Sequence, residues 1–311
     1  MKNTKPKVRL WSVLTGLTAI LTVAAIVGNI IANQYATTLN VALNASTYKI
    51  IHGENTGDTE YFKKGFASDE EREAYEAELC ATVEAEGAAL LKNENNALPL
   101  ASGAKVSLFG HGSVDLMYGG TGSGSVDTSK APNLKQALEA QGITINQTLW
   151  DLYSSDSMMS KYSRMTPASI SDTLEANTQY AVNEAPWSAL SSAESSFAEY
   201  GDAAIVVLSR SGGEGADLPS GENGTSDSWI SGQEGDGNYL ALSAEEIELL
   251  KNLKALKDNG TFKNIVVLIN SSNAIELDFL NPEICGEDYG IDAAMWIGDV
   301  GQTGINGVAQ L

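Results

Sequence analysis

The sequence predicts an α/β fold, a mostly parallel sheet covered by helices on both faces, incomplete at its C-terminal end and preceded by a transmembrane helix. Three observations predict this fold. Short continuous apolar runs, such as residues 203–208 and 264–269, are typical of strands buried on both faces. Segments with helix-capping signals lie between such runs. Glycine-rich loops follow two of the apolar runs, where a strand would end.

The N-terminal residues predict a membrane anchor. Residues 1–9 form a basic tail, and residues 10–32 are apolar and uncharged over about the length that spans a bilayer. The basic flank predicts a cytoplasmic N-terminus. A cleavable signal peptide is the alternative, although the apolar run is long for one and ends without a small-x-small site. With residues 33–67 as a polar stalk, we expect a single-pass protein of the cell membrane whose residues 68–311 form an extracellular domain.

The domain is expected to begin with a capped helix. Ser68 and Glu71 are spaced as a capping box, and Gly87 is the expected end of the helix. Residues 88–93 are a short apolar segment. Residues 95–100 indicate a turn into a proline-broken strand edge.

Alternating strands and helices account for the rest of the domain. Residues 133–141 are a predicted helix between the first two strands, and residues 149–196 show weak periodicity that suggests one or two short helices. Ser243 and Glu246 form a second capping box that opens the best-supported helix. Ligands of such sheets bind at the carboxyl ends of the strands. The five predicted strands are residues 105–109, 143–145, 203–208, 264–269 and 293–297.

Composition excludes several classes of partner. The net charge of -21 argues against nucleic acid or an anionic membrane surface, because so acidic a protein repels polyanions. Only His52 and His111 are histidines, so the sequence predicts no metal site rich in histidine and no cofactor. Cys80 and Cys285 lie far apart without neighbouring ligand residues, which leaves two inert buried thiols or one disulfide as alternatives.

Two glycine-rich loops are candidates for chemistry. The first, GGTGSGS at residues 119–125, resembles a phosphate cradle, but the preceding strand ends about ten residues earlier, which is the wrong spacing for a dinucleotide site. The second, SGGEG at residues 211–215, brackets Glu214 with glycines where a carboxyl could act as a proton donor. The alternatives for this acidic loop are solvated charge or a calcium site with oxygen ligands.

Five motifs carry a family resemblance. In chain order they are EGAALLKNE with LPL, VSLFG, GGTGSG, SGGEG with LS, and GDVGQTG, and they extend from about Glu86 to the last residue. This order resembles the α/β sandwich domain of glycoside hydrolase family 3, which includes β-glucosidases. The resemblance implies that Glu214 is the general acid/base and that Ser123 and Gly124 are neighbours of a glycoside or oligosaccharide substrate. Asp217 is either a further substrate contact or an ordinary loop acid.

The resemblance also implies a second domain. Family members are retaining enzymes in which two carboxyl groups act about 5–5.5 Å apart, and the nucleophilic aspartate belongs to a barrel domain. The predicted strands are all used by the sandwich, so we expect the barrel to be missing from this chain, in a permuted order with the sandwich first. Residues 301–311 look like the first turns of a helix without a C-cap, which predicts a truncated domain that is inactive alone. The alternatives are a non-catalytic carbohydrate-binding or interaction fragment and a nucleotide-binding domain.

Overall fold

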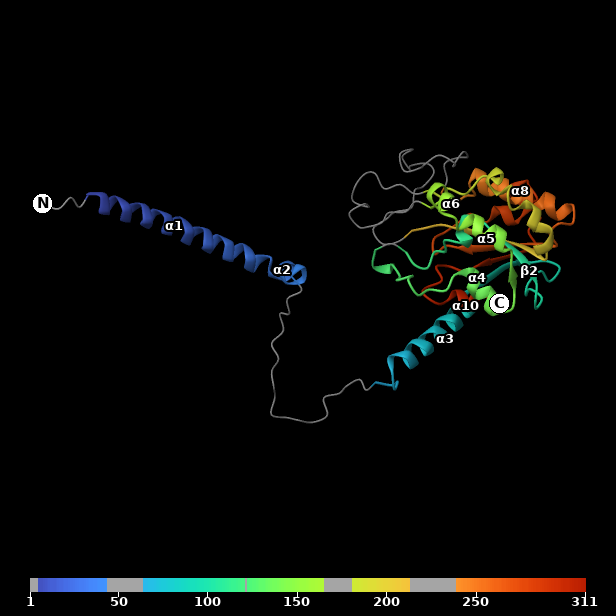
Figure 1. Cartoon of the computed structure of the whole chain (residues 1–311), viewed down its shortest axis with the longest axis horizontal. Helices are drawn as coiled ribbons and strands as arrows, with labels where there is room; N and C mark the ends of the chain where they lie inside the picture. Colours follow the sequence, from blue (N-terminus) through green and yellow to red (C-terminus); the bar gives the residue numbers. More distant parts are fainter. Residues whose placement is uncertain (1–4, 44–63, 121, 165–180, 213–238) are drawn as a thin grey trace. The chain divides into compact units, whose positions relative to one another are not determined.

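The computed structural model describes residues 5–43, 64–120, 122–164, 181–212 and 239–311. These fall into two compact units, residues 1–65 and 66–311. The first unit contains α1 (Lys5–Gln34) and α2 (Ala36–Ala42). Residues Val8–Gln34 of α1 are long and apolar enough to cross a membrane, and none of this span is buried against protein (Figure 1). The predicted apolar helix is therefore present.

The second unit is built on a six-stranded sheet with the strand order β1-β6-β5-β4-β2-β3. All neighbouring strands are parallel except β1, which is antiparallel to β6. The prediction of a mostly parallel sheet is confirmed. The strands are β1 (Ala89–Asn93), β2 (Lys105–Phe109), β3 (Thr144–Ile145), β4 (Ala203–Ser209), β5 (Asn264–Asn270) and β6 (Ala293–Trp296).

One strand lies where none was expected. The sequence predicted a proline-broken strand edge at residues 95–100, but those residues form a turn and loop, and the strand is the preceding apolar segment, β1. β1 lies at the edge of the sheet with Leu90 and Leu91 exposed. Its pairing with β6 depends on residues about 200 positions away, so local pattern could not reveal it.

Helices cover both faces of the sheet, as predicted (Figure 1). Successive residues of a strand point to opposite faces, so Ala204, Val206 and Leu208 of β4 join one core and the residues between them join the other. The first core lies under α5, α6 and α8, and the second under α4 and α10. These helices are α4 (Leu134–Ala140), α5 (Gln147–Tyr153), α6 (Asp156–Lys161), α8 (Ala244–Asp258) and α10 (Ile305–Val308).

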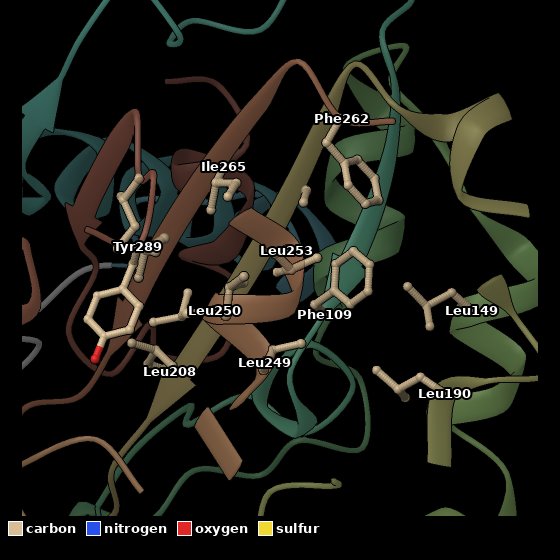
Figure 2. Close-up of a cluster of buried hydrophobic side chains, with 14 of the residues drawn as sticks. Phe109, Leu149, Leu190, Leu208, Leu249, Leu250, Leu253, Phe262, Ile265 and Tyr289 are labelled. Atoms are coloured by element: carbon tan, nitrogen blue, oxygen red, sulfur yellow. The ribbon is translucent and has the colours of Figure 1, made fainter. Parts of the chain in front are cut away.

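The first core is rich in leucine and aromatic side chains (Figure 2). Phe109 meets Phe262 edge to face with ring centroids 5.7 Å apart, and Leu253 of α8 packs over β4 and β5. Within the described residues, the remaining elements are α3 (Asp69–Gly87), α9 (Pro282–Cys285) and five 3₁₀ segments, His111–Ser113, Gly122–Gly124, Trp187–Leu190, Glu194–Tyr200 and Asp278–Leu280.

The predicted helix caps form. Ser243 accepts the Glu246 N–H while the Glu246 carboxylate accepts the Ser243 N–H, which is a complete capping box at α8. At α3, Ser68 accepts the Glu71 N–H, but the Glu71 carboxylate accepts from Ala67 instead. The predicted helix 133–141 is α4, which has its own capping box from Asn133.

α3 packs closely on α10. A Cβ atom on Gly307 would overlap the carbonyl oxygen of Ala81, which is buried on α3, so only glycine allows this approach.

Both cysteines are free thiols. Cys80, on α3, is exposed, whereas Cys285 is partly buried. The disulfide alternative is therefore wrong, and so is the expectation of a buried thiol at Cys80.

Candidate functional site

The site lies at the carboxyl ends of the parallel strands, where the strand order reverses. β3 lies on one side of β2 and β4 on the other, so the reversal falls between β2 and β4. The turn after β2 packs directly on β4. A Cβ atom on Gly110, whose φ is 84°, would lie 2.7 Å from the Val207 oxygen, and one on Gly112 would overlap the Ser209 hydroxyl. Glycine therefore brings the loops after β2 and β4 together.

Asn270, the last residue of β5, joins three of these loops. Its Nδ2 donates to the carbonyl oxygens of Met117 (3.0 Å) and Gly298 (2.7 Å). Its Oδ1 accepts from Met117 N–H (2.6 Å) and from the Ser209 hydroxyl (3.2 Å). All four bonds are buried, so this amide fixes the positions of the loops after β2, β4 and β6 relative to one another.

Arg210 directly follows β4 and is fully buried. Its guanidinium forms a two-pronged pair with Glu246 (2.8 and 2.7 Å) and donates to the carbonyl oxygens of Tyr239 and Ala241. Burial disfavours the charged guanidinium, but the Glu246 carboxylate outweighs it and raises the pKa of Arg210. The charged guanidinium therefore holds the chain at residue 210 against the chain at residues 239–241.

A second set of bonds continues this contact. Ser211 N–H donates to the Tyr239 hydroxyl (2.9 Å), and that hydroxyl is 3.1 Å from the Ser211 carbonyl oxygen. We call these bonds and the Arg210–Glu246 pair the stem clamp. The clamp therefore holds Arg210 and Ser211, directly after β4, against residues 239–241.

Three charged or titratable side chains meet beside the β2 turn. The Asp115 carboxylate lies 3.1 Å from His111 Nε2 and 2.9 Å from an Arg164 nitrogen. Burial opposes ionisation of Asp115, but the His111 hydrogen bond and the Arg164 charge outweigh it and hold its pKa below the ordinary value. Asp115 is therefore ionised, and its side chain remains 35% exposed.

Glu184 is buried next to the same turn, and none of the described residues forms an ion pair with it. Its two oxygens accept the N–H groups of His111 (2.6 Å) and Ala185 (2.9 Å). Burial raises the pKa of Glu184 to about 7, although both N–H donors and His111 favour the ionised form. A carboxyl group that titrates near neutral pH thus holds the backbone of the turn after β2.

Replacing Glu184 by glutamine should change the pH dependence of stability. An unfolded glutamate titrates near 4.5, so between pH 4.5 and about 7 the folded chain keeps a proton that the unfolded chain releases. The unfolding free energy of the wild type therefore falls as pH rises through this window, and Glu184 accounts for about 3 kcal/mol of the fall. The Glu184→Gln variant should lack this contribution when unfolding free energies are measured in urea at pH 4.5, 6 and 8.

An exposed carboxyl provides the control for this measurement. Glu139→Gln, on the surface of α4, should follow the wild-type slope. Burial also raises the pKa of Glu84 to about 7, so this group adds a second pH-dependent contribution to stability in the same window. The contribution of Glu184 is therefore the difference between the unfolding free energies of the wild type and Glu184→Gln at each pH. Parallel curves for wild type and Glu184→Gln would show that Glu184 is ionised throughout.

Asp299 follows β6 and faces the loop after β5. Its carboxylate accepts the N–H (3.2 Å) and the hydroxyl (2.8 Å) of Ser272. Burial raises the pKa of Asp299, and the Ser272 hydrogen bonds and the Arg164 charge offset this only in part. Arg164 therefore acts electrostatically on two carboxyl groups, Asp115 and Asp299, that come from different loops.

The residues predicted from sequence are only partly placed. Glu214 and Asp217 lie outside the described residues. Ser123 and Gly124 lie in the 3₁₀ segment Gly122–Gly124, both exposed. Within the described ranges, no three His, Cys, Asp or Glu side chains are grouped to hold a metal ion.

Sequence reasoning missed the polar residues that build the edge: His111 with Asp115, Arg164, Glu184, Arg210 and Asn270. One signal was available, because Arg210 and Asn270 are polar residues at the ends of the two longest buried runs. A polar residue in that position must find partners, and in a parallel sheet it finds them at the ligand-binding edge.

Comparison with known proteins identifies the fold. The sequence profile of the glycosyl hydrolase family 3 C-terminal domain matches residues 88–311. The chain belongs to glycoside hydrolase family 3. β-Glucosidase A of Butyrivibrio fibrisolvens is 29% identical over 216 residues, which is 64% of this chain and 23% of that protein.

Solved β-glucosidase structures share the architecture. A β-glucosidase from Paenibacillus barengoltzii is 26% identical with a TM-score of 0.54, over 76% of this chain and 22% of that one. β-Glucosidase 3B from Thermotoga neapolitana, in complex with glucose, is 22% identical with a TM-score of 0.55, over 77% and 29% of the two chains, and supports the fold alone. The family 3 chain thus spans less than a third of each of these relatives.

Proposed function

We propose that this chain supplies the acid/base-bearing sandwich domain of a retaining, β-glucosidase-like hydrolase of O-glycosyl compounds. The family match over residues 88–311 supports the reaction class. The observation that supports the residue is the stem clamp, which holds Ser211 at the carboxyl edge of the sheet, three positions before Glu214. A carboxyl group close to that edge would lie at the usual ligand-binding position of a parallel sheet.

The proposed mechanism uses two carboxyl groups. Glu214, protonated, donates to the glycosidic oxygen while a carboxylate from a barrel domain outside this chain attacks the anomeric carbon. The ionised Glu214 then takes a proton from a water molecule whose oxygen bonds to the anomeric carbon, and this breaks the bond to the barrel carboxylate and releases the sugar. A neighbouring carboxylate and partial burial would raise the pKa of Glu214 enough to keep its proton near neutral pH. Ser123, Gly124 and Asp217 are the proposed substrate neighbours.

We also propose the division of the chain that the sequence suggests. Residues 1–9 are a cytoplasmic tail, residues 10–32 a single-pass signal anchor and residues 33–67 a stalk. The length and composition of α1 support the anchor, since Val8–Gln34 is long and apolar enough to span a bilayer. Residues 68–311, the sandwich domain, would then face the outside of the cell, where a glycoside substrate is accessible.

A chimera tests the proposed activity. Residues 66–311, which include α3 because it packs on α10, replace the matching stretch of B. fibrisolvens β-glucosidase A. The chimera should hydrolyse 4-nitrophenyl β-D-glucopyranoside, whereas the 311-residue chain alone should not, since it supplies one of two carboxyl groups. Turnover by the purified chain alone would contradict the two-domain mechanism. A chimera that melts like its parent yet is inert would contradict the activity itself.

A further inference from the structure

Arg164 carries an unsatisfied hydrogen-bond donor at the carboxyl edge of the sheet. Its side chain is only 8% exposed, and two of its nitrogens bond to Asp115, one to the carboxylate and one to the carbonyl oxygen. Its Nε is buried and has no hydrogen-bond partner among the residues that the structure describes. Leaving a buried donor without an acceptor costs about 1–3 kcal/mol. A bound molecule that places an acceptor beside Arg164 Nε would remove this cost.

The surroundings of Arg164 are fixed by the backbone. Val300 N–H donates to the Met117 carbonyl oxygen (3.2 Å), and Gly301 N–H donates to that of Tyr118 (2.8 Å). These bonds lay the loop that carries Asp299 beside the loop that carries Asp115. Asn270 adds its bonds to Met117 and Gly298, so the two carboxyl groups are held on a rigid base.

The acceptors around Arg164 retain capacity for a ligand. Asp115 uses one carboxylate oxygen, Oδ2, for both His111 and Arg164, and a third of its side chain stays exposed. Asp299 accepts two bonds from Ser272 and is half-buried. A carboxylate oxygen can accept two hydrogen bonds, so both groups can accept further donors.

We propose that Arg164, Asp115 and Asp299 form a binding subsite for a neutral glycosyl unit. A sugar hydroxyl donates to a carboxylate and accepts from a guanidinium N–H at once, which matches this set of groups. A phosphate would accept from Arg164 but be repelled by the two carboxyl groups, and an ammonium group would pair with the carboxylates but leave Nε unsatisfied. The choice of a sugar rests on the proposed function, whereas the donor and acceptor pattern does not.

The test is binding to the full 311-residue chain in detergent micelles. Titration with methyl β-D-glucopyranoside, followed by calorimetry and saturation-transfer NMR, should give a dissociation constant on the order of 1 mM for the wild type. Arg164→Lys keeps the positive charge beside Asp115 but removes the Nε donor, so it should weaken binding at least about tenfold. Asp115→Asn and Asp299→Asn should each weaken it as well.

Matched variants separate binding from folding. Arg72→Lys on α3 and Asp127→Asn on an exposed loop should bind like the wild type. Each variant is compared by its melting temperature, and Asp299→Asn provides a second test if Arg164→Lys does not fold. Absence of glucoside binding in the wild type, equal binding by folded Arg164→Lys, or preferential binding of inorganic phosphate or methylammonium would each overturn the subsite.

The outcome is independent of catalysis. If wild type binds the glucoside and Arg164→Lys does not, the subsite stands even where the chimera is inert. If the chimera is active while Arg164→Lys binds as the wild type does, the proposed function stands and the subsite falls. The two proposals can therefore fail separately.

Discussion

Turnover of alkyl β-glucosides by the chimera should fall by about 10²–10⁴-fold when Glu214 is replaced by glutamine, because the amide cannot protonate the departing oxygen. The loss should be smaller for 4-nitrophenyl glucoside, since nitrophenolate departs without a proton. The measurement is kcat for a series of substrates whose leaving groups differ in pKa. The dependence of kcat on leaving-group pKa should steepen in the variant.

Two controls distinguish this role from a general effect of charge. Glu222→Gln alters another acid close to Glu214 in the sequence and should leave kcat within about twofold of the parent chimera. Azide, which needs no base to activate it, should restore turnover of the Glu214→Gln variant on nitrophenyl glucoside and give a glycosyl azide. Near-normal hydrolysis of alkyl glucosides by Glu214→Gln would remove Glu214 from the acid/base role.

Loss of Glu246 should be the most destabilising single change within the stem clamp. Glu246→Gln leaves the buried guanidinium of Arg210 without a counter-charge, at an expected loss of about 3–5 kcal/mol in unfolding free energy. The double variant Arg210→Met with Glu246→Leu should recover most of this loss, because it removes both buried charges together. Urea unfolding of the three chains at one pH measures the effect.

The double variant also separates stability from positioning. With the pair removed, the bonds from Arg210 to the carbonyl oxygens of Tyr239 and Ala241 are lost, and only the bonds between Ser211 and Tyr239 remain in the clamp. In the chimera this double variant should be stable but hydrolyse its substrate about 10²-fold more slowly. A displacement of about 1 Å in a reacting group is enough to cause such a loss of rate. Lys254→Met breaks only an exposed pair with Asp258 and should change stability by less than about 1 kcal/mol. Full activity of the stable double variant would contradict a positioning role.

Much of the fold was predictable where burial itself leaves a pattern in the sequence. The runs at residues 203–208 and 264–269 match β4 and β5 to within one residue, because strands covered on both faces must be apolar throughout. β1 has mostly exposed side chains and includes Lys92 and Asn93, so burial left no such pattern. Only its distant partner β6 makes it a strand.

The candidate site was less predictable, because contacts between distant segments build it. The Arg164 guanidinium bonds to the Asp115 carbonyl 49 positions away, and Glu184 accepts from His111 across 73 positions. Both Arg164 and Glu184 belong to the region 149–196, where periodicity was weak and nothing local suggested a role. The acid/base role proposed for Glu214 rests on an ordered set of motifs along the chain, and this residue lies outside the described residues.

The pairing of β1 with β6 and of α3 with α10 has a consequence for biosynthesis. β1 and α3, which leave the ribosome early, find their partners in elements made about 200 residues later. Until β6 and α10 have been synthesised, β1 has no strand to pair with. The surface of α3 around Ala81 likewise has no Gly307 to pack against. Closing so long a loop is slow, and it exposes apolar surface to aggregation meanwhile. The pairing of β1 with β6 and of α3 with α10 can therefore form only when synthesis has passed Val308.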